Sequence, residues 1–552
     1  MSETSGSSGY FYTPDEIAEM RARVQESLDT EAATMPVGDE LPVIPSAKIR
    51  EFVQSGQRGL GMLYASIQAG RFCYVHNSAR WYKLAGHYWA EDGDFKLADR
   101  AVEDVVTILT KEVATIGSEI AKPAADGNDD LVKKLQRVQK SCLSNIGYLR
   151  SSKGVDGCLR MSTSGLDSLA VPASQFDQDP WAFACSNGVL DLRTGDLRPG
   201  RPDEYITRHS PIAWQGIEAP APNWDRAILE IFDGDAELVA FLYKFYGMAL
   251  SAVRTRHLFL VHHGRGRNGK DTVLRAIKEV MGSYAVTIPA EMLLEGNFTA
   301  DAAKPSPHIM LLCGARLAVA SETDDGRKFS TSKVKWYTGG GKLTGRGLQE
   351  KRNTEFTPTH LLALDTNSKP HAPHSDFAFW ERSALVPHLL SFVQDRDPVE
   401  HYERRADAGL DKKIAAEYPG ILARLVRGCL AWQKEGIVKP SSVVSATNEY
   451  RDDEDVISPF IAQCCIESPG QKLLKHELYE GFTLYWERNV SKKVPSSQWL
   501  GTQMTAYGRF ERYKSCGLTA YKGITFTPEW QDEIDKARDR RDRSSRKRDY
   551  DA

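Results

Sequence analysis

The sequence predicts an α/β fold, and three observations in its middle part carry this prediction. The stretch 257–395 alternates short apolar strands with helices, the order expected of a parallel sheet. The apolar strand His257–Val261 runs into a glycine-rich loop and then into a helix that begins at about Lys270. Two further apolar strands, Leu317–Ala320 and Leu361–Leu364, each end on polar residues. At about 150 residues per domain, the chain has room for three or four domains around this core.

The composition is that of a soluble protein without a structural zinc site. Lys and Arg number 71 against 74 Asp and Glu, and the net charge of -3 excludes a histone-like protein coated with positive charge but allows a local basic channel. No apolar run approaches the roughly 20 residues of a membrane span, and the N-terminus lacks the pattern of a signal peptide. The nine cysteines show no zinc-ligand spacing. These features predict a cytoplasmic protein with reduced thiols and no membrane contact.

The N-terminal part divides into a tail and an α+β domain. Residues 1–45 are rich in Ser, Gly, Thr and Pro and carry nine acidic residues, which predicts a disordered acidic tail with one short helix near Pro14–Leu28. Residues 46–215 are predicted to form an α+β domain, with a hairpin at Arg71–Trp89, helices at Leu97–Ile120 and Asp130–Leu149, and two strands joined by a tight turn at 187–199. The hairpin aromatics alternate with polar residues, so we expect core packing rather than base stacking for Trp81, Tyr82, Tyr88 and Trp89.

Helical segments flank the core on both sides. Residues 216–256 are predicted to be a helical collar, with a helix over Ala227–Val253, and residues 396–447 a helical connection, with an amphipathic helix over Asp411–Glu435. The core itself is predicted to span 257–395.

The C-terminal part is predicted to be a small domain followed by a tail. Residues 448–530 combine helices with a β-hairpin at Tyr513–Phe526. Residues 531–552 are predicted to be a disordered basic tail, because Lys536–Arg548 carries eight basic residues. Such a tail either attracts nucleic acid nonspecifically or only adds solubility.

The segment HHGRGRNGKDT (262–272) has the strongest chemical signal. Glycines let the backbone approach phosphate oxygens, the helix N-terminus adds N–H donors, and Lys270 is placed to reach the β- and γ-phosphates. The pattern predicts an ATP-binding loop formed by Gly264, Arg265, Gly266, Arg267, Asn268, Gly269, Lys270, Asp271 and Thr272. Asp271 stands where the pattern GxxxxGK[ST] has a hydroxyl residue. Either Asp271 ligates Mg²⁺ directly or through water, or Thr272 supplies the hydroxyl.

Two later strands deliver polar side chains suited to ATP hydrolysis. Glu322 follows the strand Leu317–Ala320 and is the predicted carboxylate for the magnesium and the attacking water, with Asp324 and Asp325 as close substitutes. Asn367 follows Leu361–Leu364 between the other two strands and is predicted to orient the water and sense the γ-phosphate. The alternative is an Asn that only forms a turn.

Arg382 lies in the aromatic segment DFAFWERSALVPH (376–388), fifteen residues after Asn367. In a ring assembly such an arginine enters the ATP site of the neighbouring subunit as an arginine finger. The alternative is a surface salt bridge with a nearby acid such as Glu381.

Taken together, Glu322, KWYTGGGKLTGRGLQEKRNTEF (335–356), LALDTN and WERSALVPH resemble the superfamily 3 helicases. The resemblance is closer to the C-terminal helicase portion of phage and plasmid primase–helicases. It extends to WYKLAGHYW, SNGVLDLRTGDLRP, SPFIA and LYEGFTLYWERN, and so covers about residues 70–527.

The resemblance implies an AAA+-like P-loop ATPase core that assembles into a ring, commonly a hexamer, and translocates 3′→5′ on single-stranded DNA. It implies that Lys270, Glu322, Asn367 and Arg382 are catalytic. Residues 335–356 correspond to a hairpin that projects into the central channel, where Lys351 and Arg352, and next Lys342 and Arg346, contact DNA.

The sequence departs from the family at three positions. Asp271 replaces the hydroxyl residue, Gly341 stands where the family has Asp, and Glu381 replaces the first of two arginines before Ser383. The primase domain of the family is expected to be missing, because no zinc ribbon or primase metal triad is present in the sequence.

Residues 448–526 have the element order of a winged helix, with Ser496–Gly508 as recognition helix and Tyr513–Phe526 as wing. Its basic surface favours DNA over a protein partner and is formed by Lys475, Lys492, Lys493, Arg509, Arg512, Lys514 and Lys522.

The sequence therefore predicts an ATP- and Mg²⁺-dependent replicative DNA helicase of a phage, prophage or plasmid, in the bacterial cytoplasm. Its predicted partners are single-stranded DNA, forked duplex, copies of itself and a separate primase or polymerase. Two alternatives stay open: an origin-binding initiator or loader ATPase, and a DNA-binding module whose nucleotide site is a slow switch.

Overall fold

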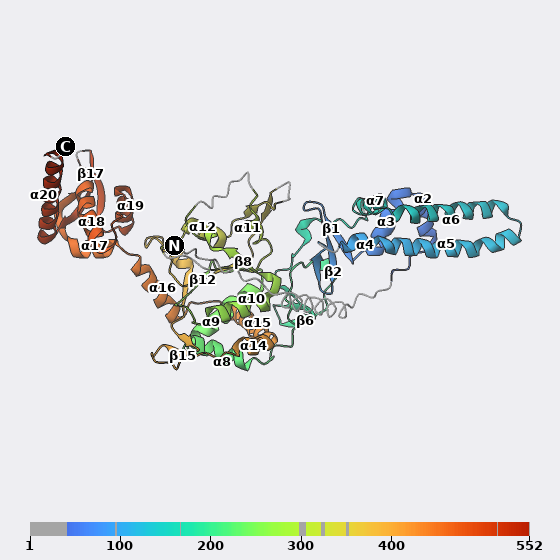
Figure 1. Ribbon diagram of the computed structural model, residues 1–552, viewed down its shortest axis with the longest axis horizontal. Coiled ribbons are helices and arrows are strands. Elements are labelled where there is room, and N and C mark those ends of the chain that lie inside the picture. Colours follow the sequence, from blue (N-terminus) through green and yellow to red (C-terminus); the bar gives the residue numbers. More distant parts are fainter. Residues whose placement is uncertain are drawn as a thin grey trace, which may run out of the picture.

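The computed structural model of the protein describes residues 41–93, 96–165, 167–296, 305–321, 326–348, 353–515 and 517–550. The chain forms three parts in a row: an N-terminal part with a long helical hairpin, a central α/β part and a small C-terminal part (Figure 1). The predicted acidic tail up to residue 40, with its helix near Pro14–Leu28, lies outside the described residues. Within the described ranges, no helix is both long and apolar enough to cross a membrane.

The N-terminal part confirms the predicted helices. Six helices surround one apolar core: α2 (Ser46–Gln54), α3 (Gly56–Gln68), α4 (Leu97–Arg100), α5 (Val102–Ala125), α6 (Asp129–Leu149) and α7 (Ser152–Ser162). Helices α5 and α6 are antiparallel and extend far beyond the others (Figure 1). The short Asp126–Asn128 connection favours this antiparallel packing. Within it, the side chain of Asn128 caps α6 by accepting a hydrogen bond from the N–H of Leu131.

The predicted hairpin is a three-stranded antiparallel sheet of β1 (Phe72–Val75), β2 (Arg80–Ala85) and β3 (Tyr88–Glu91). Its aromatic side chains pack inside the protein, as expected. Trp89 is buried, Trp81 packs against the core of the helices, and Tyr88 stacks on His209 with 3.7 Å between ring centroids. The alternation of aromatic and polar residues is thus explained by packing rather than by a base-stacking surface.

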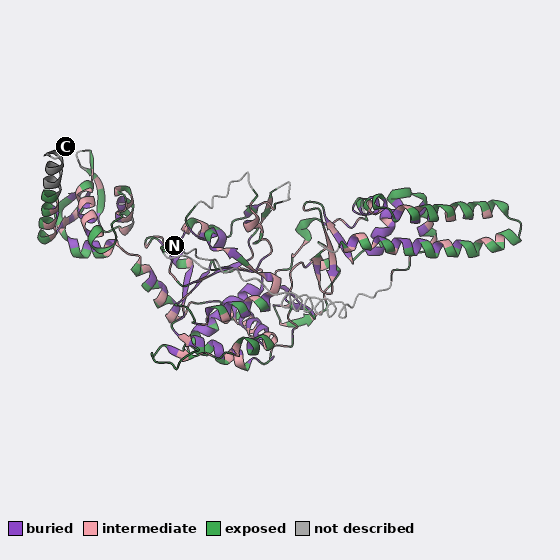
Figure 2. Cartoon of the chain, in the orientation of Figure 1, coloured by how far each residue is buried: buried purple, intermediate pink, exposed green. Residues whose placement is uncertain are grey.

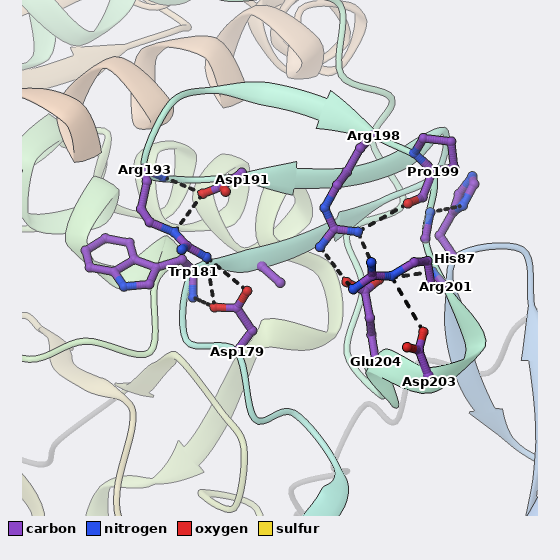
Figure 3. A network of polar contacts seen from close by, with 12 residues as sticks. His87, Asp179, Trp181, Asp191, Arg193, Arg198, Pro199, Arg201, Asp203 and Glu204 are labelled. Carbon is purple, nitrogen blue, oxygen red and sulfur yellow. Dashed lines mark hydrogen bonds and ion pairs between the residues drawn. The ribbon is translucent and has the colours of Figure 1, made fainter.

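A second antiparallel sheet connects this part to the centre. It contains β4 (Ala182–Cys185), β5 (Gly188–Asp191) and β6 (Asp196–Arg198), the last two being the strands predicted at 187–199. Figure 3 shows the polar contacts beside it: Arg193 pairs with Asp179 and Asp191, Arg198 pairs with Glu204, and the N–H of Gly200 donates to His87 Nδ1. Since His87 belongs to the β2–β3 turn, the hydrogen bond from Gly200 joins the two sheets.

The central part contains a five-stranded, fully parallel sheet, which confirms the predicted α/β class. Its order is β13-β7-β12-β9-β8, and its strands are β7 (Phe259–His263), β8 (Ala285–Pro289), β9 (Leu317–Ser321), β12 (Leu361–Thr366) and β13 (Ser383–Pro387). Separate apolar cores pack on its two faces. The first core includes α8 (Pro222–Ile231), α9 (Ala236–Leu250), α10 (Lys270–Met281), α14 (Leu410–Ala416) and α15 (Tyr418–Glu435).

Two helices that the sequence predicts as continuous are interrupted. Between α8 and α9, Asp233 and Gly234 adopt left-handed φ angles of 50° and 82°, and the side chain of Asp235 caps α9. Between α14 and α15, the carboxylate of Glu417 accepts hydrogen bonds from the backbone N–H groups of Asn223 and Trp224. Glu417 thus caps the N-terminus of α8 instead of continuing a helix, a long-range contact that periodicity cannot reveal.

The remaining central elements surround the sheet, and several of them contribute residues to the second core. They are α11 (Pro307–Met310), α12 (Thr331–Thr338), the antiparallel pair β10 (Leu343–Gly345) and β11 (Thr354–Phe356), α13 (Phe377–Arg382), the parallel pair β14 (Ser391–Val393) and β15 (Glu403–Arg405), and α16 (Ser441–Asp453).

The C-terminal part confirms the predicted β-hairpin, formed by β17 (Glu511–Ser515) and β18 (Leu518–Phe526). Strand β16 (Cys465–Leu474) completes a sheet of order β16-β18-β17, and three helices accompany it: α17 (Ile457–Cys464), α18 (Lys475–Asn489) and α19 (Ser497–Tyr507).

The disordered tail expected from residue 531 is wrong for the described residues, because Pro528–Tyr550 form helix α20. Its Ile534 is buried in the core of the C-terminal part, and ion pairs join Arg538 to Glu480 and Glu533 to Arg488. The high charge of this segment suggested disorder, but Ile534 is buried, and two charged residues near it pair with α18.

Candidate active site

The glycine-rich loop lies between β7 and α10, at the carboxyl edge of the parallel sheet. Two of its glycines are required by geometry. Gly269 has φ +81°, and an added Cβ would lie 2.6 Å from Ile231 Cγ1; at Gly264 an added Cβ would lie 2.4 Å from both Asn268 Nδ2 and the His388 carbonyl oxygen. Arg267, with φ 60°, holds the left-handed conformation without being a glycine. The loop is therefore closely packed and fixed in one shape.

A cavity of about 820 Å³ opens over this loop, a volume in the range of small-molecule sites. Its polar floor is formed by the loop and by the carboxyl ends of β9 and β12. Its apolar wall is formed by the other lining side chains, which include Ala227, Ile231, Leu274, Phe392 and Leu410. The cavity thus combines N–H donors at a helix N-terminus with an apolar wall, an arrangement that accommodates a phosphorylated ligand with a flat apolar group.

Lys270 lies on the floor of this cavity and is only 4% exposed. Its Nζ donates to the Gly264 carbonyl at 2.8 Å, to Asn268 Oδ1 at 3.3 Å and to Asn367 Oδ1 at 2.8 Å. Burial lowers the pKa of Lys270, while the nearby Asp365 and Asp271 raise it. The ammonium group is held by three oxygens and is available to exchange one of them for a phosphate oxygen.

Strand order explains how Asn367 reaches Lys270 from 97 residues away. Strand β12 pairs with β7 on one side and β9 on the other, as expected for a strand between the other two. Asn367 follows β12 directly, as the loop follows β7, so the two carboxyl ends meet.

Asp365, the next-to-last residue of β12, is a site residue to which the sequence analysis gave no role. Burial raises its pKa, Lys270 lowers it and the carboxylate of Asp271 raises it. Its Oδ1 is buried without a hydrogen-bond partner among the described residues. Both carboxylates line the cavity, so the departure at Asp271 brings a second carboxylate next to the first.

This pair fits a magnesium ion in its chemistry. Mg²⁺ prefers oxygen ligands and is usually bound by one or two carboxylates together with substrate phosphates and water. Thr272 lies beside the pair and also lines the cavity. Glu322, the third predicted ligand, lies outside the described residues, as do Asp324 and Asp325. Within the described ranges, no group of three or more His, Cys, Asp or Glu side chains is placed to hold a metal.

A buried chain of hydrogen bonds connects the glycine-rich loop to α9. His388 Nδ1 lies 3.3 Å from the carbonyl oxygen of Asn268, His388 Nε2 lies 2.8 Å from His262 Nδ1, and His262 Nε2 lies 2.7 Å from the hydroxyl of Tyr246. Burial lowers the pKa of His262 to about 3 and that of His388 well below its ordinary value, so both rings are neutral at pH 7.

Neutral rings allow only one direction for this chain. The Asn268 carbonyl can only accept, so His388 Nδ1 donates to it and His388 Nε2 accepts. His262 Nδ1 therefore donates, and His262 Nε2 accepts from the Tyr246 hydroxyl. The chain fixes both tautomers and connects the loop to α9, which orients the carbonyl of Asn268 and thereby the side chain next to Lys270.

Arg382 lies far from Lys270 within one subunit. It ends α13 directly before β13, whose first residue pairs with Phe259 at the start of β7, whereas the loop follows the end of β7. A strand of this length places the two edges roughly 15 Å apart. Arg382 Nη1 donates to the Ala378 carbonyl, and within the described ranges Arg382 forms no salt bridge, so the alternative pairing with Glu381 is absent.

The predicted DNA-contacting segment begins as helix α12 and becomes a hairpin only at β10. Lys342 pairs with Glu355 across this hairpin at 2.8 Å, and the backbone of Arg346 exchanges hydrogen bonds with Ser306. Lys351 and Arg352 lie outside the described residues. The end of α12 is fastened to the segment before β7, because Arg254 donates to the Gly339 carbonyl and His257 Nδ1 lies 2.6 Å from that of Thr338.

Comparison with known proteins shows that the chain is similar to viral proteins named as helicases and primases. The profile of the "D5 N terminal like" family matches residues 62–233. The chain is 21% identical over 471 residues to "Putative helicase L207/L206" of Acanthamoeba polyphaga mimivirus, covering 82% of this chain and 48% of that protein. It is 23% identical over 376 residues to "Putative helicase 022R" of Frog virus 3, covering 55% and 38%. It is 25% identical over 339 residues to "Putative primase C962R" of African swine fever virus, covering 57% and 34%.

The chain thus spans about half the length, or less, of the curated relatives it matches. Among solved structures, "The A form apo structure of NrS-1 C terminal region-CTR" aligns with a TM-score of 0.44 and 9% identity, covering 84% of this chain and 98% of that one. The matched N-terminal domain and the similarity to these viral proteins support a relationship to the D5-like primase–helicases.

Proposed function

We propose that the protein is an ATP-driven DNA helicase of superfamily 3 that acts in viral, phage or plasmid replication. The observation that carries the proposal is the contact of Lys270 with Asn367 at 2.8 Å, on the floor of the cavity over the glycine-rich loop. Lys270 binds the phosphate, and Asn367 senses it at the same point. The names of the relatives, helicases and primases of large DNA viruses, support the same activity.

ATP binds with its phosphates on the loop 264–272 and its base against the apolar wall at Ile231 and Phe392. Lys270 exchanges the Gly264 carbonyl for a phosphate oxygen, and Asn367 orients the attacking water. Asp271 and Asp365, with Thr272 and Glu322, hold Mg²⁺, which neutralises charge on the phosphates when bound. The residues contribute mainly by positioning and by electrostatic stabilisation.

Arg382 acts in the ATP site of a neighbouring subunit. Its place at the edge of the sheet opposite to Lys270 supports this role, because it suits a ring in which each subunit completes the site of the next. We therefore propose a homo-oligomer, a hexamer by resemblance to superfamily 3.

The β10–β11 hairpin contacts single-stranded DNA in the channel, through Lys351 and Arg352 and next through Lys342 and Arg346. Translocation is 3′→5′ by resemblance. The C-terminal part is a winged helix, an interpretation supported by its element order α17-β16-α18-α19-β17-β18. In it, α19 is the recognition helix, and the β17–β18 hairpin is the wing, which carries exposed Arg512, Lys514 and Lys522.

Hydrolysis of ATP with and without single-stranded DNA tests this proposal. We expect DNA to stimulate hydrolysis several-fold, because the helix α12 that precedes the channel hairpin is fastened to the segment that leads into β7 and the ATP loop. The two alternatives give other results. An initiator or loader responds to one duplex sequence and loses this response when residues 448–527 are deleted. A slow switch binds ATP tightly but shows negligible turnover.

A further inference from the structure

Helix α6 carries an unneutralised row of basic side chains on the part of the molecule farthest from the ATP site. Lys133, Lys134, Arg137 and Lys140 are all exposed, and between Leu131 and Leu149 the helix contains no acidic residue. Figure 2 shows that the outer portions of α5 and α6 are exposed along most of their length. The row therefore lies on a long, solvent-facing rod.

The geometry of α6 places three of these cations on one line. The helix buries Leu135, Cys142, Ile146 and Leu149 against the N-terminal core. At about 100° per residue, Lys133, Arg137 and Lys140 lie on the opposite side, at i, i+4 and i+7 spacing. Like charges at this spacing repel one another, so the row destabilises α6 unless an anion lies beside it.

No protein anion supplies that neutralisation within the described ranges. None of the four cations has an ion-pair or hydrogen-bond partner there. On the neighbouring helix α5, Glu112 and Glu119 are already paired with Arg50 of α2, at 2.7 Å and 2.9 Å. Asp129 and Asp130, in the first turn of α6, form no ion pair with the lysines one turn later; there they interact favourably with the helix N-terminus.

We propose that this row, the α6 basic face (Lys133, Arg137 and Lys140, with Lys134 beside them), binds the sugar–phosphate backbone of duplex DNA. The row spans about 10 Å, over which one strand of a duplex carries about three phosphates. Single-strand sites combine basic residues with aromatic side chains on which bases stack, but residues 131–147 contain no aromatic residue. The chemistry therefore favours a backbone contact with duplex over a contact with unpaired bases.

This surface extends the proposed function, because it adds a duplex contact outside both the channel hairpin and the C-terminal part. A ring that separates strands has duplex on one side of it, and a projecting arm that binds backbone without reading sequence keeps that duplex in place. The binding is independent of ATP, so its test and that of the ATPase can fail separately.

The test is the affinity of the full chain for a blunt 30-bp duplex and for a single strand of the same length, measured by fluorescence anisotropy at several salt concentrations without nucleotide. The test variant is Lys133→Gln with Arg137→Gln and Lys140→Gln. The control removes three exposed cations from the same part of the chain: Arg58→Gln, Lys111→Gln and Lys122→Gln.

We expect the test variant to bind duplex at least about tenfold more weakly at low salt, and its slope of log affinity against log salt to fall by about 2 to 3. The control and the affinity for single strand should stay close to wild type. An unchanged slope, an equal loss in the control, or a loss confined to single strand would overturn the proposal. A changed oligomeric state of the test variant by mass photometry, with duplex binding intact, would instead make the face an interface between copies.

Discussion

Replacing Lys270 with alanine is expected to lower the rate of ATP hydrolysis by at least about 10²-fold, the usual effect of removing one electrostatic stabiliser of a transition state. The ammonium group is buried and reaches the loop carbonyl of Gly264 and the side chain of Asn367, so no other described cation occupies its place. Lys270→Arg should also fail, because a planar guanidinium does not fit between these two oxygens.

The measurement is steady-state ATP hydrolysis at saturating Mg²⁺, with a thermal melt of each variant to verify folding. Lys434→Ala is the control, since Lys434 is an exposed lysine at the end of α15, away from the cavity. Hydrolysis by Lys270→Ala within a few-fold of wild type would mean that phosphate is bound elsewhere.

Arg382→Ala is expected to reduce hydrolysis by about 10³-fold or more, the effect of arginine fingers in other ATPases and GTPases. Arg382 and Lys270 lie at opposite edges of one sheet, so each ATP site would combine Lys270 of one subunit with Arg382 of its neighbour. A neighbour with an intact Arg382 should therefore restore the activity of a site that has an intact Lys270. We expect Lys270→Ala and Arg382→Ala, each inactive alone, to recover activity when mixed. In a random ring of equal parts, about a quarter of the interfaces combine an intact Lys270 with an intact Arg382.

The control is Glu381→Ala, the exposed neighbour on the same helix, which should hydrolyse ATP at the wild-type rate. If the mixture stays inactive although the two variants exchange subunits, Arg382 does not act across the interface. If Arg382→Ala alone is active, the arginine finger is another residue.

Local patterns made the centre of the site predictable. The strand, loop and helix around Lys270 are contiguous in sequence, and each has a signature that depends on its own residues: an apolar run, glycines at positions with little space, and a helix beginning at the lysine. The place of Asn367 followed from the same logic, because a polar residue that ends a parallel strand lies at the edge where the other strands end.

Contacts between distant segments were not predictable. The role of Asp365 is evident only in the structure, where β12 brings it beside Asp271. The Asp at position 271, which departs from the family pattern, is thus one of a pair of carboxylates. The chain from Tyr246 through His262 to His388 joins residues from α9, β7 and the segment after β13, up to 126 residues apart. In sequence, no spacing marks these three residues as partners of one another.

The two interrupted helices and α20 illustrate the same limit. Periodicity indicates which face of a helix is apolar. It does not show that a helix is interrupted at Glu417, whose carboxylate caps another helix at Trp224, 193 residues away. High charge suggested disorder after residue 530, although a single buried residue, Ile534, and ion pairs to α18 accompany a helix there.

Strand displacement on a forked duplex tests the central claim most directly. The full chain is incubated with a fork that has a labelled strand, with ATP, without ATP, and as the Lys270→Ala variant. The account predicts displacement that requires both ATP and Lys270. Hydrolysis of ATP without displacement of the strand on any fork polarity would contradict it, because the site would then be an ATPase that does not drive unwinding.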